Sequence, residues 1–253
     1  MTFQLIQGDC RIVLRDLEAN SAQLVFADPP YLLSNGGFSV ASGKQVSVNK
    51  GDWDVSGGFE SDARFHEDWL DAVRHILHPD GTIFVSGTFH SIYKTGFALE
   101  KLGYRILNNI TWFKPNAAPN LSGRSFAAAN ETLIWASKSR NSKHTFNYEL
   151  MKNSDFPKDS IKNPGKQMRD VWAISTPPPG EKTYGKHPTQ KPLALLDRII
   201  RAASHEGDLI VDPFVGSGTT GVAAVQNGRR FVGIDQDINY LELAEQRIKG
   251  ASR

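Results

Sequence analysis

The sequence predicts an α/β protein with a mostly parallel, twisted sheet and helices on both faces. Short apolar runs typical of buried strands alternate with segments whose apolar residues recur every three or four positions, as in amphipathic helices. Two of these runs lead to an aspartate, Asp28 or Asp212, and then to a turn containing proline or glycine. A length of 253 residues allows one large or two small domains, and we expect a single domain over residues 1–253.

The opening of the chain has the pattern of a βαβ unit. Residues 3–6 predict a strand, 11–17 a helix and 23–27 a second strand. The two strands of such a unit are expected to be parallel neighbours, which would place Asp9 and Asp28 at the same edge of the sheet. Asp9 is equally suited to cap the N-terminus of the helix, a role compatible with a functional one.

The same patterns predict the other elements. They are helices at 65–77, 91–102 and 193–200, strands at 82–86, 104–113, 131–136, 208–212 and 230–235, and helices after the glycine turn 213–221 and near the C-terminus. The chain therefore closes with a second βαβ-like unit. His66, His75 and His78 lie on or beside the helix at 65–77. No pair at i, i+4 has a nearby carboxylate that would complete a metal site, so no metal site is expected.

Residues 32–62 interrupt this regular pattern. They are rich in Gly, Ser, Asn, Val and Lys and show no clear period. Connections of this length are unusual inside a compact domain and are often lids or binding loops. Because the segment starts directly after Tyr31, we interpret it as a mobile flap that can bring Lys44, Lys50 and Trp53 to a ligand. A disordered insertion is the alternative.

The basic charge is confined to one stretch. Residues 101–201 contain 17 Lys and Arg against 7 Asp and Glu, a net charge of +10, whereas the rest of the chain has 12 against 20, a net charge of −8. Within this stretch, residues 138–186 lack periodicity and interleave basic residues with aromatic ones, as nucleic-acid-binding surfaces do. A solvated basic face without a partner would produce the same charge pattern.

The segment Asp28-Pro29-Pro30-Tyr31 follows a buried strand and is the first candidate for chemistry. The prolines fix a rigid turn whose carbonyls face outward. Asp28 and the Pro29 carbonyl can accept the two hydrogens of an exocyclic amino group, while Tyr31 stacks on the ring that carries it. A proline turn that merely ends a core strand is the structural alternative.

The second candidate is the glycine turn at 216–221, with the pattern Gly-x-Gly-x-x-Gly. It follows a strand and opens a helix, and Asp235 lies 19 residues after Gly216 at the end of the next strand, where it can bind ribose hydroxyls. Both a dinucleotide and S-adenosylmethionine fit such a site. Asp212 would repel a pyrophosphate but attract the methionine ammonium, which favours S-adenosylmethionine.

Three segments resemble motifs IV, X and I of the amino-group DNA methyltransferases. They are Asp28–Tyr31, His187–Pro192 and Asp212–Gly221, and their order is similar to that of the β group of this family. The resemblance covers nearly the whole chain. It implies a single Rossmann-like, S-adenosylmethionine-dependent methyltransferase domain with a circularly permuted motif order, in which the strand ending at Asp9 lies beside the strand ending at Asp235.

The resemblance also assigns site residues. Asp28, Pro29, Pro30 and Tyr31 would be catalytic, and the cofactor would be bound by Asp9, His187, Thr189, Lys191, Asp212, Phe214, Gly216, Ser217, Gly218, Thr219, Thr220 and Asp235. Asp9 would reach the cofactor's adenine. His187, Thr189 and Lys191 would lie near its methionine end. The basic region, approximately residues 115–186, would hold the target-recognition segment.

The implied reaction is methylation of the N6 amino group of adenine in flipped-out or single-stranded DNA. Asp28 favours adenine, because the cytosine-N4 enzymes of the family more often have serine there, and cytosine-N4 methylation is the alternative. Residues 33–37 and 46–51 resemble the accessory adenine methyltransferases of Dpn-type restriction systems, which act on GATC, including single strands. The family further implies a homodimer and a separately encoded cognate restriction endonuclease.

Two other classes of protein stay open from the sequence alone. An NAD-dependent oxidoreductase would bind NADH in place of S-adenosylmethionine, and a noncatalytic module would bind DNA without transferring a methyl group. The single cysteine excludes an intrachain disulfide, no eighteen apolar residues run together, and residues 1–8 lack a basic segment followed by an apolar run. We therefore expect a cytoplasmic protein with no membrane contact.

Overall fold

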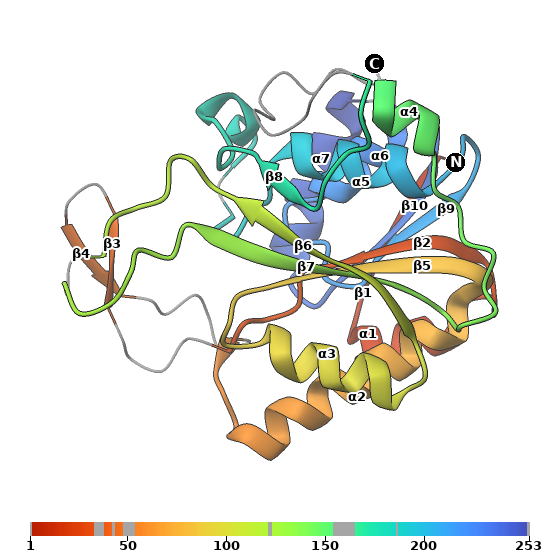
Figure 1. The fold of residues 1–253 in the computed structure, drawn as a ribbon, viewed down its shortest axis with the longest axis horizontal. Coiled ribbons are helices and arrows are strands. Elements are labelled where there is room, and N and C mark those ends of the chain that lie inside the picture. The colour runs from red at the N-terminus through yellow and green to blue at the C-terminus, as the bar shows by residue number, and fades with distance from the viewer. Residues whose placement is uncertain are drawn as a thin grey trace.

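The computed structural model describes residues 2–32, 38–41, 44–47, 54–120, 123–153, 165–185 and 187–251. Within these ranges an eight-stranded sheet has the order β1-β10-β9-β2-β5-β7-β6-β8 (Figure 1). Its strands are β1 (Phe3–Gln7), β2 (Ala22–Ala27), β5 (Leu77–Gly87), β6 (Arg105–Phe113), β7 (Asn130–Ser137), β8 (Val171–Ala173), β9 (Leu209–Asp212) and β10 (Arg230–Asp235). The five strands from β1 to β5 in this order are parallel, and β7 runs antiparallel to both of its neighbours.

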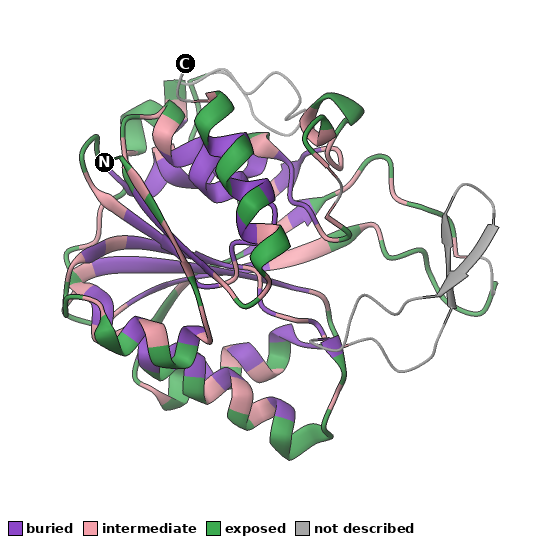
Figure 2. Ribbon diagram, turned by 180° about the vertical axis from the view of Figure 1, so that it is seen from behind, coloured by how far each residue is buried: buried purple, intermediate pink, exposed green. Residues whose placement is uncertain are grey.

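Helices cover both faces of the sheet (Figure 1). One face carries α1 (Cys10–Asp16), α2 (Phe59–Ile76) and α3 (Ile92–Lys101), and the other carries α5 (Leu193–Ala203), α6 (Thr219–Gln226) and α7 (Ile238–Ala251). Alternate residues of a strand point to opposite faces, so β2 sends Leu24 and Phe26 toward α5 and α6, and Val25 and Ala27 toward α1 and α2. The sheet is therefore buried on both sides (Figure 2), and the predicted α/β fold class is confirmed.

The strands that carry the two candidate segments are neighbours. Leu24 of β2 pairs with Ile210 of β9, and Val25 pairs with Val211. Because both strands are parallel, Asp28 and Asp212 leave the sheet side by side at the same edge. The order of the strands reverses here, since β9 and β10 lie on one side of β2 and β5 lies on the other. This is the position at which open α/β sheets bind ligands.

One expectation about the opening unit is wrong. β1 and β2 are not neighbours, because β10 and β9 lie between them. The C-terminal β9–α6–β10 unit takes the place next to β2 and leaves the outer edge of β10 for β1, where Gln7 pairs with Asp235. The neighbouring positions of the strands that end near Asp9 and Asp235 are thus confirmed. All four strands stay parallel, so Asp9 and Asp28 share an edge as expected.

Several element boundaries differ from the expected ones. α2 begins at Phe59, inside the segment expected to be loop, and Asp62 fixes its first turn by accepting hydrogen bonds from Ser56, Gly57 and Lys94. β5 begins at Leu77, five residues earlier than expected. An irregularity in its pairing with β2 absorbs residues 78–81.

The two irregular regions contain some regular structure. In the expected flap, β3 (Phe38–Ala41) and β4 (Lys44–Ser47) form an antiparallel hairpin. Lys50 and Trp53 lie outside the described residues, as do residues 33–37 and 48–49. The basic region contains α4 (Tyr148–Asn153), β8 and a 3₁₀ helix at Pro179–Lys182, none of which was expected. No helix in the described ranges is long and apolar enough to span a membrane.

Candidate active site

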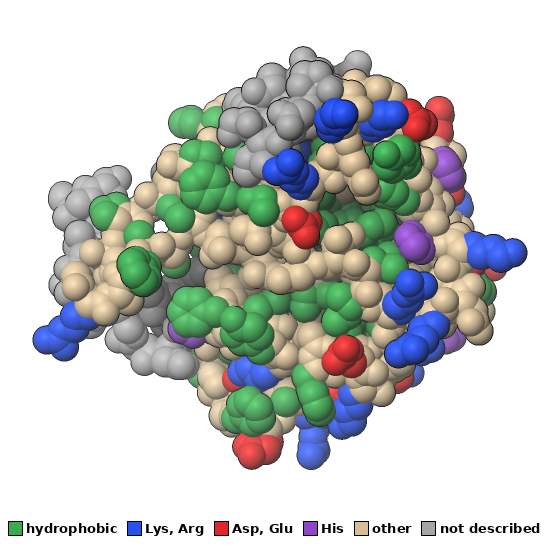
Figure 3. Space-filling model, in the orientation of Figure 1, with side chains coloured by type: hydrophobic (Ala, Val, Ile, Leu, Met, Phe, Trp, Pro, Cys, Tyr) green, Lys and Arg blue, Asp and Glu red, His purple; other side chains and the backbone are tan. Residues whose placement is uncertain are grey.

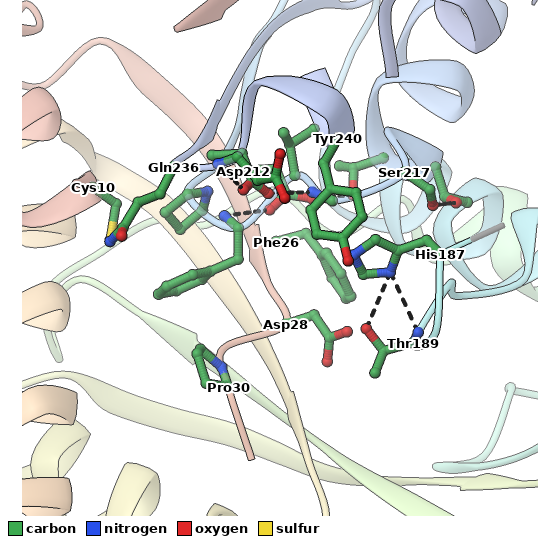
Figure 4. Close-up of a pocket in the computed structure, with 18 of the residues that line it drawn as sticks. Cys10, Phe26, Asp28, Pro30, His187, Thr189, Asp212, Ser217, Gln236 and Tyr240 are labelled. Carbon is green, nitrogen blue, oxygen red and sulfur yellow. Dashed lines mark hydrogen bonds between the residues drawn. The ribbon is translucent and has the colours of Figure 1, made fainter. Parts of the chain in front are cut away.

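A cavity of about 370 Å³ lies at the edge of the sheet where β1, β10, β9 and β2 end. Most of the residues assigned from the sequence line it: Asp9, Asp28, Pro30, His187, Thr189, Lys191, Asp212, Phe214, Gly216, Ser217, Thr219, Thr220 and Asp235. Pro29 and Gly218 do not line it. Figure 4 shows Asp28 at the end of β2 pointing toward Thr189 and His187, which come from the segment before α5. Residues far apart in the sequence thus line the same cavity.

Asp212 is the most deeply buried carboxyl group of this cavity, with 2% of its surface exposed. Its Oδ1 accepts the backbone N–H of Phe214 at 2.9 Å, and its Oδ2 accepts the hydroxyl of Thr220 at 2.5 Å. Burial raises the pKa of Asp212 to about 7, against the opposing effect of these two hydrogen bonds. A cationic ligand would favour the ionised form, so this carboxyl group is suited to an ammonium.

Asp235 shapes the glycine turn. Its carboxylate accepts the backbone N–H of Gly216 at 2.9 Å and that of Asp237 at 3.0 Å, one on each oxygen. Each carboxylate oxygen has a second acceptor position, so two neighbouring hydroxyls of a ribose can still bind. Burial raises the pKa of Asp235. The turn is thereby held open beside a carboxylate, as nucleoside binding requires.

Glycine is required at two positions of this turn. Gly216 has φ +47°, and a Cβ there would lie 3.0 Å from Nε2 of His187. Gly218 has φ +77° as the N-cap residue of α6, and a Cβ there would lie 2.7 Å from Cβ of Ala244 in α7. Gly218 therefore acts by letting α7 approach, which explains why it does not line the cavity.

The segment before α5 closes one side of the cavity. His187 Nδ1 accepts the backbone N–H of Thr189 at 3.3 Å, and its ring lies 4.3 Å from that of Tyr240 in an edge-to-face arrangement (Figure 4). Burial lowers the pKa of His187 to about 4, so the imidazole is neutral at physiological pH. Neutral His187 and Tyr240 form a wall that does not repel a positively charged ligand.

Asp9 caps α1, one of the two roles considered for it, and its position leaves the other open. Its Oδ1 caps α1 by accepting the backbone N–H of Arg11 at 2.9 Å, and its carboxylate also pairs with the Arg11 guanidinium. The hydrogen bond from that guanidinium holds the pKa of Asp9 below its usual value. Asp9 lines the cavity as well, next to Gly8 and Cys10. Its contact with a cofactor adenine stays a prediction.

The Asp28–Tyr31 turn separates this cavity from a second one of about 220 Å³. Tyr31 lines the second cavity, and His187, Thr189 and Lys191 line both. Lys191 Nζ lies 2.5 Å from Asp28 Oδ2, and the Tyr31 hydroxyl lies 2.9 Å from Asp28 Oδ1. The Ser86 hydroxyl also binds Asp28 Oδ1. Asp28 thus lines the first cavity and is held by hydrogen bonds from two residues, Tyr31 and Lys191, that line the second.

Sequence reasoning missed several residues of the site. They are Phe26, Phe65, Gln236, Asp237 and Tyr240 in the first cavity, and Trp112, Lys114 and Glu131 in the second. Gln236 and Asp237 could have been found, because they directly follow a strand that ends in a predicted site residue. Glu131 gave one signal, a charged residue at the start of an apolar strand. Phe65 and Tyr240 resemble ordinary helix residues in sequence.

S-Adenosylmethionine fits the donor set of the first cavity. A buried carboxyl group, Asp212, is available for its ammonium, and a second carboxylate, Asp235, lies at the end of the next strand for its ribose. The glycine turn presents backbone instead of side chains to the ligand. No group of three or more potential metal ligands occurs among the described residues, His66, His75 and His78 included.

The family follows from comparison with known proteins. A family model described as DNA methylase matches residues 22–246, so the chain belongs to this family of DNA methylases. It is an S-adenosylmethionine-dependent DNA methyltransferase, as the three motifs predict. The solved complex of M1.HpyAVI with S-adenosylmethionine matches with a TM-score of 0.69 at 25% identity, over 97% of this chain and 98% of that one.

Individual relatives are close in sequence. The chain is 51% identical to Type II methyltransferase M2.LlaDCHI of Lactococcus lactis subsp. cremoris, over 98% of this chain and 90% of the relative. It is 50% identical to Type II methyltransferase M2.DpnII of Streptococcus pneumoniae, over 97% and 89%. The resemblance to Dpn-type methyltransferases is thus confirmed. The cytosine-N4-specific PvuII DNA methyltransferase shares the fold, with a TM-score of 0.73 at 20% identity over 98% of this chain and 86% of that one.

The raised pKa of Asp212 predicts how cofactor affinity depends on pH. Binding an ammonium requires the ionised carboxylate, so affinity for S-adenosylmethionine should rise about tenfold or more between about pH 5.5 and about pH 7.5. Calorimetric titration across this range measures the effect. His187 does not titrate there, because its pKa is about 4. Asp212→Asn should bind more weakly and lose most of the pH dependence. An equal slope in the variant would contradict the assignment.

Proposed function

We propose that this chain transfers the methyl group of S-adenosylmethionine to the N6 amino group of adenine at a specific DNA sequence. The observation that supports this most strongly is that Asp28 lines the first cavity and contacts Tyr31 and Lys191, which line the second. A base in the second cavity would present its amino group to Asp28, while a cofactor in the first would present its methyl group from the other side. The target base would have to leave the DNA stack to reach this position.

Each residue of the Asp28–Tyr31 turn has a distinct proposed task. Asp28 and the carbonyl of Pro29 accept the two amino hydrogens and so direct the nitrogen lone pair toward the cofactor. Tyr31 stacks on the base, while Pro30 lines the cofactor side of the turn. The remaining residues hold the cofactor: Asp212 its ammonium, Asp235 its ribose, Asp9 its adenine, and the glycine turn with His187, Thr189 and Lys191 its methionine part.

The bound cofactor supplies an electrophilic methyl group on a positively charged sulfur. The amino nitrogen forms a bond to the methyl carbon as the carbon–sulfur bond breaks, and the sulfur keeps the electron pair of that bond. The nitrogen becomes positively charged and then loses a proton, first to Asp28 and from there to water. No covalent enzyme intermediate is needed. Burial raises the pKa of Cys10 to about 12, which argues against a thiolate nucleophile.

The biological setting is proposed from the same family relationship. The relatives named above are Type II methyltransferases, which supports a role in a restriction–modification system with a separately encoded endonuclease. We propose GATC as the recognition sequence, in double- or single-stranded DNA, and the basic region at approximately 115–186 as its reader. Asp28 favours adenine over cytosine N4. DNA and S-adenosylmethionine as substrates are consistent with action in the cytoplasm, as is the unpaired Cys10.

Replacement of Asp28 tests this mechanism. Asp28→Ala should lower methyl transfer to DNA by about 1000-fold or more, because the amino group loses its acceptor. Transfer of a tritiated methyl group measures the rate, and the digested product should contain N6-methyladenine. Calorimetry should show cofactor binding within about threefold of the unaltered chain, since Asp212 and Asp235 remain. Glu18→Ala, which alters an exposed carboxylate, is the matched control. A fully active Asp28→Ala variant would exclude the mechanism.

We also propose that the chain forms a homodimer through the outer face of α3. Tyr93 and Phe97 lie one turn apart on α3, Phe89 lies in the turn just before this helix, and Phe59 lies at the start of the adjoining α2. These four aromatic side chains are 61–76% exposed, and Figure 3 shows hydrophobic side chains gathered over this part of the molecule. Such a concentration of exposed aromatic surface is unusual for a monomer.

Sedimentation velocity tests the dimer. The unaltered chain should sediment as a dimer at about 10 μM, and Tyr93→Glu combined with Phe97→Glu should sediment as a monomer, because two charges would be buried at the interface. Tyr148→Glu, at a 40% exposed aromatic residue of α4, is the control and should stay dimeric. A dimer that survives the double substitution would place the interface elsewhere.

A further inference from the structure

A buried group of charges lies directly behind the proposed catalytic turn. Glu131, at the start of β7, contacts both Lys114 and Lys191, with Nζ to carboxylate oxygen distances of 3.0 and 3.5 Å. Lys191 in turn binds Asp28. The side chains of these four residues are only 7–16% exposed. Two carboxylates and two ammonium groups therefore balance within a region that is largely closed to water.

Glu131 and Asp28 share their partners. The Tyr31 hydroxyl lies 2.9 Å from Oε2 of Glu131 and 2.9 Å from Oδ1 of Asp28. Lys191 Nζ is within 4 Å of the same two carboxylates. Lys191 and Tyr31 therefore both hold Asp28, and Glu131 in turn holds both of them. Glu131 itself lines only the second cavity, whereas Lys191 lines both.

The charged state of this group follows from the contacts. Burial alone would raise the pKa of Glu131, but the ammonium groups of Lys191 and Lys114 lower it to about 2. Burial alone would lower the pKa of Lys191, but the carboxylates of Asp28 and Glu131 raise it. Burial and the same two carboxylates raise the pKa of Tyr31 well above its usual value. At neutral pH, Glu131 is ionised, Lys191 is protonated and Tyr31 keeps its proton as a donor.

These contacts leave Asp28 little freedom. A carboxylate has about four acceptor positions, two on each oxygen. Tyr31 and Ser86 lie against Oδ1, and Lys191 lies against Oδ2. The remaining position is on Oδ2, which is where an amino hydrogen of the base can bind. Any movement of Lys191 or Tyr31 would change which position is open.

We propose that Glu131 is a positioning residue for methyl transfer. Through Lys191 and Tyr31 it holds Asp28 with one acceptor position open, and its negative charge keeps the buried group neutral. The inference rests on the function proposed above, in which the amino nitrogen becomes positively charged. Without the charge of Glu131, the buried group would carry a net positive charge. This charge would repel the positive charge that develops on the amino nitrogen, so the rate of transfer would fall.

Glu131→Gln tests the proposal, because glutamine keeps the shape of the side chain and removes its charge. The kcat for DNA methylation should fall about 10- to 100-fold. The KM for S-adenosylmethionine and its calorimetric Kd should stay within about twofold, since Glu131 lies outside the cofactor cavity. An unchanged kcat would overturn the proposal, whether or not the Kd for the cofactor increases.

A second substitution separates charge from simple loss of structure. Lys114→Met removes one positive charge, so the double variant with Glu131→Gln is neutral again and should recover at least about threefold of the lost kcat. A purely structural role predicts that losing both partners is no better than losing one, and a double variant as slow as Glu131→Gln would overturn the proposal. If Glu131→Gln does not fold, Glu131→Asp should still show reduced kcat with unchanged cofactor KM, and a normal kcat would contradict us.

The same measurements distinguish a wrong role for Glu131 from a wrong proposed function. If the unaltered chain transfers no methyl group to DNA, or if Asp28→Ala is active, the proposed function itself is wrong. If the unaltered chain is active, Asp28→Ala is inactive and Glu131→Gln matches the unaltered chain in kcat, only the role of Glu131 is wrong.

Discussion

The buried ion pair between Asp28 and Lys191 joins the two parts of the site. The residues are 163 positions apart in sequence, and their charged atoms are 2.5 Å apart at the boundary of two cavities. An ion pair this deeply buried does little for stability, but the loss of one partner leaves an uncompensated charge. The fold must therefore bring the end of β2 and the start of α5 together accurately. The parallel pairing of β2 with β9 and the packing of α5 on that face of the sheet make this possible.

The electrostatics of the two cavities are complementary. In the first cavity, the buried carboxyl group of Asp212 and the partly buried one of Asp235 have raised pKa values, and a cation would drive both to the ionised form. On the other side, the ammonium groups of Lys114 and Lys191 neutralise Asp28 and Glu131. The first arrangement favours a positively charged ligand. The second fixes the carboxylate of Asp28 in place without adding net charge, which suits the proposed reaction, in which positive charge moves from sulfur to nitrogen.

Much of this arrangement could be predicted from the sequence. Asp28 and Asp212 each follow an apolar strand, and parallel strands end at a common edge, so their meeting required only that the strands be neighbours. The position of β1 could not be predicted from local pattern, because its pairing depends on β10, more than 220 residues later. Only the order of the family motifs indicated that β1 lies beside β10. Glu131 was missed because nothing in the sequence shows that β7 runs antiparallel, which places the start of this strand, and Glu131 with it, at the site edge. The close approach of Gly218 to α7 could not be predicted either, because it depends on where that helix packs.

If the two cavities together methylate adenine, DNA in contact with the protein must carry N6-methyladenine. Expression of the chain in a host that lacks DNA methylation, followed by sequencing that identifies modified bases, tests it most directly. We expect N6-methyladenine at one short sequence, GATC, throughout the host DNA. N4-methylcytosine, or DNA without any modified base despite folded protein, would contradict it.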